Sequence, residues 1–210
     1  FGSPNKAGSA DVHGAPLGEE EIEKTREALG WIYSPFEVPQ EVYDFWDSKN
    51  SGAELNSDWD NIIKTYQDNY PNDSSELLRR IEAAMPNNFQ TKFEEFLNDC
   101  CSNDSSMATR KASKVCLDFF VKEMPELLGG SADLTPSNNT FSASSTTFSN
   151  ENPSGNHINY GVREFGMSAI MNGMVLHGGI KPYGATFLVF TDYARNAVRL
   201  SALMLSLIHI

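Results

Sequence analysis

Basic residues, cysteines and long hydrophobic runs are all scarce in this sequence. Its 210 residues contain 16 Lys and Arg against 28 Asp and Glu, which gives a formal net charge of −12. A general nucleic-acid-binding protein needs clustered Lys and Arg for phosphate contacts, and no segment supplies such a cluster. We therefore expect no nucleic-acid partner, although local arginines could still bind a small phosphorylated molecule.

No apolar run approaches the length of a membrane span, and no secretory signal is recognisable, so we expect no membrane partner. The three cysteines, Cys100, Cys101 and Cys116, are odd in number and lack metal-ligand spacing. Free thiols in a cytoplasmic protein are the expectation from this usage. Hydrophobic residues make up 40% of the chain, which is enough for a real core.

The first half of the chain has a helical pattern. Apolar residues recur at helical spacing between Gly, Pro, Asn and Asp breaks. The polar run CCSNDSSM then follows and is the best linker candidate. The predicted helices are GEEEIEKTREALGW, PQEVYDFWDSKN, SDWDNIIKTYQDNY, SSELLRRIEAAM and FQTKFEEFLNDC.

The second half alternates between helix and strand patterns. TRKASKVCLDFFVKEM, NYGVREFGMSAIMNGM and FLVFTDYARNAVRLSALM read as helices, and PELLGGSADLTPSN and KPYGAT read as short strands, the first opening into a loop. This alternation predicts an α/β fold with a parallel sheet and flanking helices, whose ligand sites lie beyond the carboxyl ends of the strands. The serine-rich tract at 142–156 has little to bury and is expected to be an exposed loop.

Glu164 stands out because it lies on an apolar helical stripe. Met167, Ile170, Met171 and Met174 follow it at spacings of three and four, which places its carboxyl group on the core side, where a charge is disfavoured. Two structural interpretations compete with a catalytic one. A first-turn glutamate is favoured by the helix dipole, and the neighbouring Arg163 could neutralise it.

An aromatic row and three isolated polar residues are the other candidates. Phe187, Phe190 and Tyr193 recur every three residues, a pattern typical either of core packing or of a wall for a flat heteroaromatic ligand. The remaining candidates are His13, in a glycine-flanked turn, and Arg110 and Ser137, which could bind a sugar hydroxyl or phosphate.

Together these segments resemble the transketolase family, which depends on thiamine diphosphate. The resemblance covers nearly the whole chain and is most specific in LGGSADLTPSN and YGVREFGM. It is carried by GSPNKAGSADVHGAPLG, ATRKAS, LGGSADLTPSN, YGVREFGMSAIMNGM and PYGATFLVFTDYARNAVRLSALM.

The resemblance implies roles for individual residues. Glu164 matches the catalytic glutamate that bonds N1′ of the cofactor's aminopyrimidine, and Phe190 matches the ring stacked on that pyrimidine. His13 matches the histidine that approaches both cofactor and sugar. Phe187 and Tyr193 would complete the pyrimidine pocket, Asp133 would lie at the cofactor, and Arg110 and Ser137 would hold the substrate phosphate.

The implied activity is transfer of a two-carbon ketol unit from a ketose phosphate to an aldose phosphate through a thiamine-diphosphate ylide. The family's cofactor is held by Mg²⁺ or Ca²⁺, its members are homodimers, and they act in the pentose phosphate pathway and the Calvin cycle. Two alternatives stay open. One is a dihydroxyacetone synthase-like enzyme, and the other is an inactive truncated paralogue that acts as a dimerisation module.

The resemblance also implies a thiamine-diphosphate-binding fold in three parts. Residues 1–73 would be the C-terminal part of a diphosphate-binding domain, 74–106 a helical interdomain linker, and 107–210 the N-terminal part of a pyrimidine-binding domain. The family's metal-binding motif does not occur in the sequence, so we expect a fragment that is inactive alone and whose metal ligands lie outside it. We also expect LSLIHI to be foreign to the family, and a plastid location if a transit peptide precedes the chain.

Overall fold

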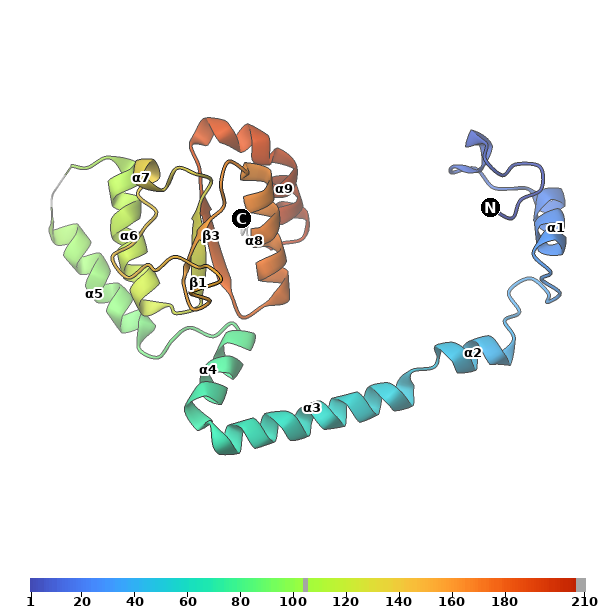
Figure 1. Cartoon of the computed structure of the whole chain (residues 1–210), viewed down its shortest axis with the longest axis horizontal. Coiled ribbons are helices and arrows are strands. Elements are labelled where there is room, and N and C mark those ends of the chain that lie inside the picture. The colour runs from blue at the N-terminus through green and yellow to red at the C-terminus, as the bar shows by residue number, and fades with distance from the viewer. Residues whose placement is uncertain (104–105, 207–210) are drawn as a thin grey trace. The chain divides into compact units, whose positions relative to one another are not determined.

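The computed structural model of the chain describes residues 1–103 and 106–206 (Figure 1). Residues 207–210, the end of the run LSLIHI, lie outside the described residues. The chain divides into two compact units, Phe1–Ile62 (unit 1) and Ile63–Ile210 (unit 2). The two units are described separately.

Unit 1 is a loop followed by helices, as its sequence predicts. The loop contains one 3₁₀ turn, η1 (Ala10–Val12), and leads into α1 (Glu19–Ala28) and α2 (Gln40–Trp46). Three glutamates in the first turn of α1 and Arg26 in its last turn complement the helix dipole. The long α3 (Lys49–Asn69) begins in unit 1 and ends in unit 2.

Two shorter helices follow α3 in unit 2. α4 (Pro71–Ile81) starts with a proline at its first position, where the missing N–H has no intrahelical acceptor to lose. α5 (Phe89–Ser102) then runs antiparallel to α6 (Thr109–Glu123). All the helices predicted for the first hundred residues are therefore confirmed.

Five phenylalanines join α5 to α6 and are called the phenyl cluster here. The closest pair, Phe96 and Phe119, is stacked with ring centroids 4.5 Å apart and an interplanar angle of 15°. Such pairs contribute about 1 kcal/mol beyond the burial of their area. The phenyl cluster consists of Phe89, Phe93 and Phe96 on α5 and Phe119 and Phe120 on α6.

Unit 2 contains a parallel sheet of three strands, in the order β2-β1-β3. β1 (Leu127–Ser131) is central and pairs with β2 (His157–Asn159) and β3 (Lys181–Ala185). β1 and β3 confirm the two predicted strands. β2 was not predicted, because a three-residue strand has no measurable alternation.

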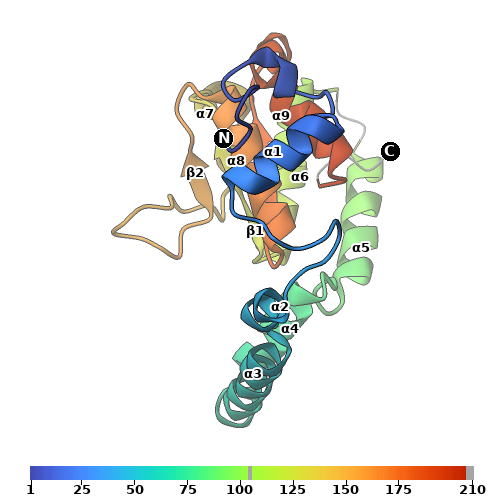
Figure 2. The same cartoon turned by 90° about the vertical axis from the view of Figure 1, so that its right-hand side faces the viewer.

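Helices cover both faces of this sheet, as expected for an α/β fold. Figures 1 and 2 show α8 (Glu164–His177) and α9 (Thr191–Leu203) together on one face, and α6 lies on the other face. The core beside α8 consists of Ala132, Tyr160 and Met167, with Ile158 and Met171 packed against them.

The serine-rich tract at 142–156 is a loop whose residues are mostly exposed, as expected, but two of its serines are buried. Ser142 and Ser145 are 2% and 8% exposed, and the backbone N–H of Ser142 donates to the Ser145 hydroxyl at 3.0 Å. The backbone N–H of Ala143 donates to Asp118 of α6 at 2.8 Å. Small polar side chains can be buried when they are hydrogen-bonded, and composition alone does not reveal those partners.

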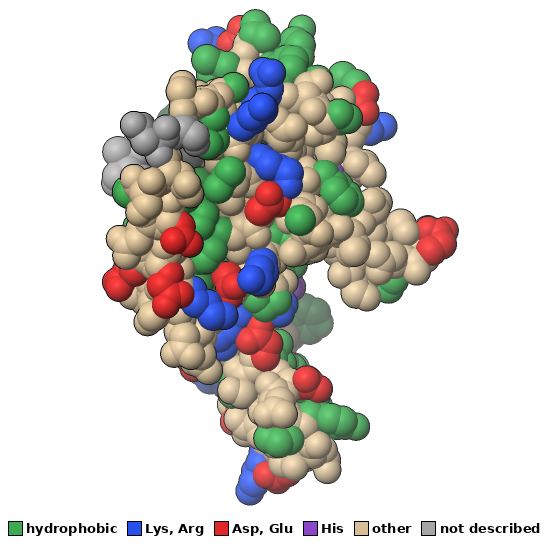
Figure 3. Space-filling model, turned by 90° about the vertical axis from the view of Figure 1, so that its left-hand side faces the viewer, with side chains coloured by type: hydrophobic (Ala, Val, Ile, Leu, Met, Phe, Trp, Pro, Cys, Tyr) green, Lys and Arg blue, Asp and Glu red, His purple; other side chains and the backbone are tan. Residues whose placement is uncertain are grey.

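The surface of unit 2 carries mixed charge. Figure 3 shows acidic and basic side chains interspersed over the face that carries α5 and α6, where Lys92 pairs with Glu123 and Lys114 pairs with Asp118. The three cysteines are exposed free thiols, as predicted. Within the described ranges, no helix is both long enough and apolar enough to cross a membrane.

Candidate active site

The carboxyl end of β1 leads directly into the first candidate residues. Asp133 follows the strand by two positions and has a left-handed backbone, with φ of 59°. The chain then forms one helical turn, α7 (Thr135–Asn138), which carries the exposed Ser137. Both residues therefore lie at the edge of the sheet where parallel strands place their ligand sites.

Glu164 is the first residue of α8 and is 7% exposed, which confirms its predicted burial. The predicted stripe is only partly right, since Met167 is buried but Ile170 is 49% exposed. The buried face of the helix turns instead through Ser168 and Asn172. Hydropathy could not identify these two polar residues as buried, because their burial depends on hydrogen bonds from elsewhere in the fold.

The Glu164 carboxyl group makes no hydrogen bond and no ion pair within the described part of the chain. Arg163 does not neutralise it, because the Arg163 guanidinium donates from Nη1 to the Tyr160 carbonyl at 3.0 Å. Of the two structural interpretations, only the helix-dipole one is compatible with this geometry. A buried carboxyl group without a protein partner can accept or share a proton with a bound ligand.

The aromatic row lies between β3 and α9. Phe187 precedes a short 3₁₀ helix, η2 (Leu188–Phe190), and Tyr193 lies in the first turn of α9. Ring centroids are 6.1 Å apart for Phe187 and Phe190, and 6.0 Å apart for Phe190 and Tyr193. The predicted row of three rings is confirmed, although a 3₁₀ turn carries its centre.

One hollow of about 570 Å³ brings four of the predicted residues together. Asp133, Glu164, Phe190 and Tyr193 all line it, and Phe187 is next to it through its stack on Phe190. A polar anchor beside an aromatic wall suits a flat nitrogen heterocycle. Arg163, considered above only as an ion-pair partner of Glu164, also lines the hollow, and the sequence did not single out the other lining residues, which are Ala132, Leu134, Val162 and Phe165.

Arg110 is exposed in the first turn of α6, outside this hollow. Figure 1 shows the beginning of α6 and the short α7 at the same end of unit 2, beyond the carboxyl end of β1. Arg110 and Ser137 thus belong to elements that meet at one edge of the sheet.

His13 belongs to unit 1. It is exposed, and its backbone N–H donates to the Ala10 carbonyl at 3.0 Å at the end of η1. Lys6 Nζ closes the surrounding loop by donating to the Leu17 carbonyl at 2.9 Å. Sequence reasoning missed the residue that organises the start of this loop, which is Glu21.

Glu21 is 6% exposed although it lies among other glutamates in the first turn of α1. It accepts hydrogen bonds from the Ser3 hydroxyl and from the backbone and side chain of Asn5, the latter two at 2.9 and 2.8 Å. These bonds lower the pKa of Glu21 to about 2. The carboxylate therefore stays charged and fixes the loop that leads to His13.

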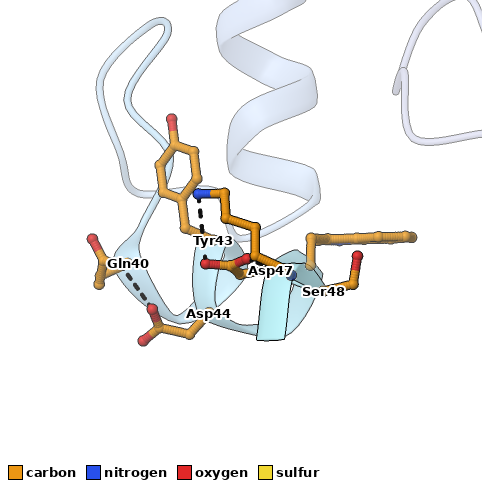
Figure 4. Close-up of a pocket in the computed structure, with 7 residues that line it drawn as sticks. Gln40, Tyr43, Asp44, Asp47 and Ser48 are labelled. Atoms are coloured by element: carbon orange, nitrogen blue, oxygen red, sulfur yellow. Dashed lines mark hydrogen bonds and ion pairs between the residues drawn. The ribbon is translucent and has the colours of Figure 1, made fainter. Parts of the chain in front are cut away.

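A second hollow, on α2 in unit 1, contains none of the predicted residues. Gln40 donates to Asp44 at 2.8 Å, as Figure 4 shows with a dashed line. Lys49 pairs with Asp47 at 3.8 Å. Those groups already have partners, so this open surface does not match the unpartnered carboxyl group of the hollow at Glu164.

Two family profiles match most of the chain. The family profile described as "Transketolase, thiamine diphosphate binding domain" matches residues 1–86, and "Transketolase, pyrimidine binding domain" matches residues 105–210. The chain belongs to the transketolase family. The predicted family and the α/β fold are thereby confirmed.

Individual transketolases are similar over nearly the whole chain. Transketolase 1 of Escherichia coli is 52% identical over 204 residues, and transketolase 1 of Vibrio cholerae is 50% identical over 204 residues. Each alignment covers 97% of this chain and 31% of the relative, so the chain spans about a third of the length of these curated transketolases.

Solved transketolase structures have the same fold. Transketolase from Leishmania mexicana superposes with a TM-score of 0.81 at 38% identity, over 97% of this chain and 30% of its own. The Pichia stipitis transketolase complex with sedoheptulose-7-phosphate superposes with a TM-score of 0.76 at 37% identity, and the match covers 90% of this chain and 29% of the Pichia chain.

Proposed function

We propose that the full-length protein containing this chain transfers a two-carbon ketol unit from a ketose phosphate to an aldose phosphate, with thiamine diphosphate as cofactor. One observation carries the proposal: the buried Glu164 has no partner among the described residues and lines a hollow with Phe190 and Tyr193. All the relatives compared above are named transketolases, which favours this activity over that of a dihydroxyacetone synthase.

The residues around the hollow fit the aminopyrimidine of thiamine diphosphate. Glu164 would share a proton between its carboxyl oxygen and N1′ of that ring, because no described residue occupies its carboxyl oxygens. Phe190 would stack on the pyrimidine, with Phe187 and Tyr193 fixing the orientation of its ring. When bound, the cofactor supplies a thiazolium carbon that is nucleophilic toward a ketose carbonyl.

The remaining candidates would act on the substrate or the cofactor. Arg110 and Ser137 would hold the sugar phosphate, whose binding energy orients the reacting carbonyl. His13 would donate a hydrogen bond to oxygen as charge develops on it. Asp133 would contact the cofactor from the turn after β1.

The wider assembly is part of the same proposal. Residues 1–73 would end a diphosphate-binding domain, 74–106 would link it, and 107–210 would begin a pyrimidine-binding domain. The metal, Mg²⁺ or Ca²⁺, would be bound by residues outside this chain. The protein would be a cytoplasmic or plastid homodimer of the pentose phosphate pathway or Calvin cycle, and the 210-residue chain alone would show no turnover.

The test is Glu164→Gln in the full-length protein, with Glu151→Gln, an exposed glutamate of the serine-rich tract, as the matched control. We expect Glu164→Gln to lower kcat at least about a hundredfold, because the amide cannot exchange the proton at N1′. Glu151→Gln should leave turnover of ketose and aldose phosphates unchanged. Near-normal kcat in Glu164→Gln would refute the role given to this carboxyl group.

A further inference from the structure

The last residue of β1, Ser131, connects the segments that carry the candidate site. It is 0% exposed, and its Cα is in register with Asn159 of β2 and Ala185 of β3. All three strands therefore reach their carboxyl ends at Ser131.

The Ser131 hydroxyl uses its full hydrogen-bonding capacity. It donates to the Ala185 carbonyl at 3.1 Å, and it accepts from the backbone N–H of Leu134 at 3.2 Å and from Asn138 Nδ2 at 2.9 Å. A serine hydroxyl offers one donor and two acceptor lone pairs, so these three partners saturate it. A fully satisfied buried polar group of this kind specifies one arrangement of its neighbours.

Two of these bonds hold α7 at both ends. Leu134 is the residue before the turn and Asn138 is its last residue, with Ser137 between them. A single helical turn is unstable by itself, since nucleation costs more than one backbone hydrogen bond returns. The same bond fixes the backbone of Asp133, because the hydrogen bond between Leu134 and Ser131 closes a short loop that contains this left-handed residue.

The third bond extends to the aromatic row. Ala185 ends β3 two residues before Phe187, and its carbonyl also accepts from the backbone N–H of Ala132 at 3.0 Å. One hydroxyl thus joins the chain leading to Ser137 with the chain leading to Phe190.

We infer that Ser131 is a positioning residue that sets the distance between the substrate-phosphate group at Ser137 and the cofactor ring at Phe190. This inference rests on the proposed function. Ser131 is fully buried and does not line the hollow, so it would act through the turn at 133–138 and the segment at 185–190.

Other contacts also hold α7, and one of them reaches β3, since the Tyr183 hydroxyl donates to the Thr140 carbonyl just after the turn at 3.2 Å. The Ser131 hydroxyl differs because it bonds to both ends of the turn and to Ala185.

Two further contacts do not reach β3. Thr135 Oγ1 lies 3.3 Å from His157 Nε2, and Thr140 Oγ1 donates to Asn138 Oδ1 at 3.0 Å. These contacts tie the turn to β2 and to itself. Loss of the Ser131 hydroxyl should therefore loosen the turn without unfolding the sheet.

The test compares Ser131→Ala with Ser142→Ala in the full-length protein. Ser142 is also fully buried, but among the described residues its hydroxyl accepts only from the backbone N–H of Ser144, at 3.0 Å. We expect Ser131→Ala to raise the KM for a phosphorylated aldose about tenfold, the cost of about one hydrogen bond, and to leave the KM for a short unphosphorylated aldehyde within about twofold. Ser142→Ala should change neither of these two KM values.

A second measurement, hydrogen exchange, does not depend on enzyme activity. Hydrogen exchange in the cofactor-free full-length protein should become faster at both 133–138 and 185–190 in Ser131→Ala, and in neither segment in Ser142→Ala. If Ser131→Ala does not fold, Asn138→Ala should show the same selective rise in KM, because it removes one of the three bonds.

An equal rise in KM for the phosphorylated and the unphosphorylated acceptor would overturn the inference about Ser131. Unchanged hydrogen exchange in both segments would overturn it as well. Absence of ketol transfer by the unmutated full-length protein would instead overturn the proposed function. The exchange measurement would still report on Ser131 in that case, so the two failures are distinguishable.

Discussion

Arg79 and Glu126, 47 residues apart in sequence, form a two-point ion pair that joins α4 to the residue before β1. Arg79 Nη1 lies 3.0 Å from Glu126 Oε1, and Nη2 lies 2.9 Å from Oε2. The side chains are 13% and 2% exposed, and Arg79 also binds Glu76. Burial alone would raise the pKa of Glu126, but the bonds from Arg79 bring it below its ordinary value.

Glu126→Ala should destabilise unit 2 by about 3 kcal/mol, because it leaves part of a buried guanidinium without its carboxylate. Far-UV circular dichroism during urea unfolding measures this loss. All three tryptophans precede Ile63, so their fluorescence reports on unit 1 instead. Glu20→Ala is the control, since Glu20 pairs with Lys24 at a side chain that is 84% exposed, and it should leave the free energy of unfolding nearly unchanged. Equal losses in the two variants would contradict the assignment.

His157 should make unit 2 less stable in mild acid. It is 0% exposed, its Nδ1 has no partner among the described residues, and burial lowers the pKa of the ring from its ordinary 6.5. The unfolded chain then binds more protons than the folded chain as pH falls through about 6.5, so stability decreases below that pH.

We expect the urea midpoint of the unmutated chain to decrease when the pH is lowered from about 7.5 to about 5.5. In His157→Phe this decrease should be smaller, because the contribution of His157 is removed. His177→Gln, at an exposed histidine, should keep the whole fall. A variant His157→Phe with an unchanged pH dependence would show that this ring does not cause it.

Gly130 should not tolerate a side chain. A Cβ built there would lie 1.8 Å from the Ile158 carbonyl oxygen, which belongs to the backbone of β2 and cannot move alone. Gly130→Ala should therefore cost about 3 kcal/mol or separate β2 from β1. At Gly173 in α8, apart from the adjacent residues and the helix's own backbone, no heavy atom of the described residues lies within 4 Å of the same position, so Gly173→Ala should be neutral or stabilise by up to about 1 kcal/mol. Thermal unfolding of the two variants checks the difference, and similar melting temperatures would disprove it.

Phe190→Ala should weaken binding of thiamine diphosphate to the full-length protein about tenfold, because it removes the stacking face in the hollow. Phe187→Ala should have a smaller effect, since Phe187 contacts Phe190 and does not line the hollow. Leu188→Ala, at a side chain that is 86% exposed, is the control. Titration calorimetry would decide the matter, and an unchanged Kd for Phe190→Ala would place the pyrimidine elsewhere.

The sequence predicts most of this architecture because the helices carry periodic signals and the two predicted strands alternate with helices along the second half of the chain. The burial of Glu164 and the row from Phe187 to Tyr193 follow from spacing alone. The gathering of Asp133 with them in one hollow does not, since it depends on parallel strands ending at the same edge.

What the sequence could not predict depends on hydrogen-bond partners that are distant along the chain. Ser131 lies in a glycine-rich strand and gives no periodic signal, although its hydroxyl joins three segments. Asn172 is similar, since its side chain is buried by bonds to Ala197 and Ser201 of α9. Polar residues of this kind are identified by their contacts and not by their hydropathy.

The phenyl cluster has a consequence for the order of folding. Its rings come from two consecutive helices, so Phe96 and Phe119 meet after closure of a short stretch of chain, whereas Ser131 must find Ala185 across 54 residues. Loop-closure entropy favours the local contact, and the α5–α6 hairpin should form first during synthesis. Because α6 contacts β1, this early hairpin would give the nascent central strand a nonpolar surface before either neighbouring strand has been translated.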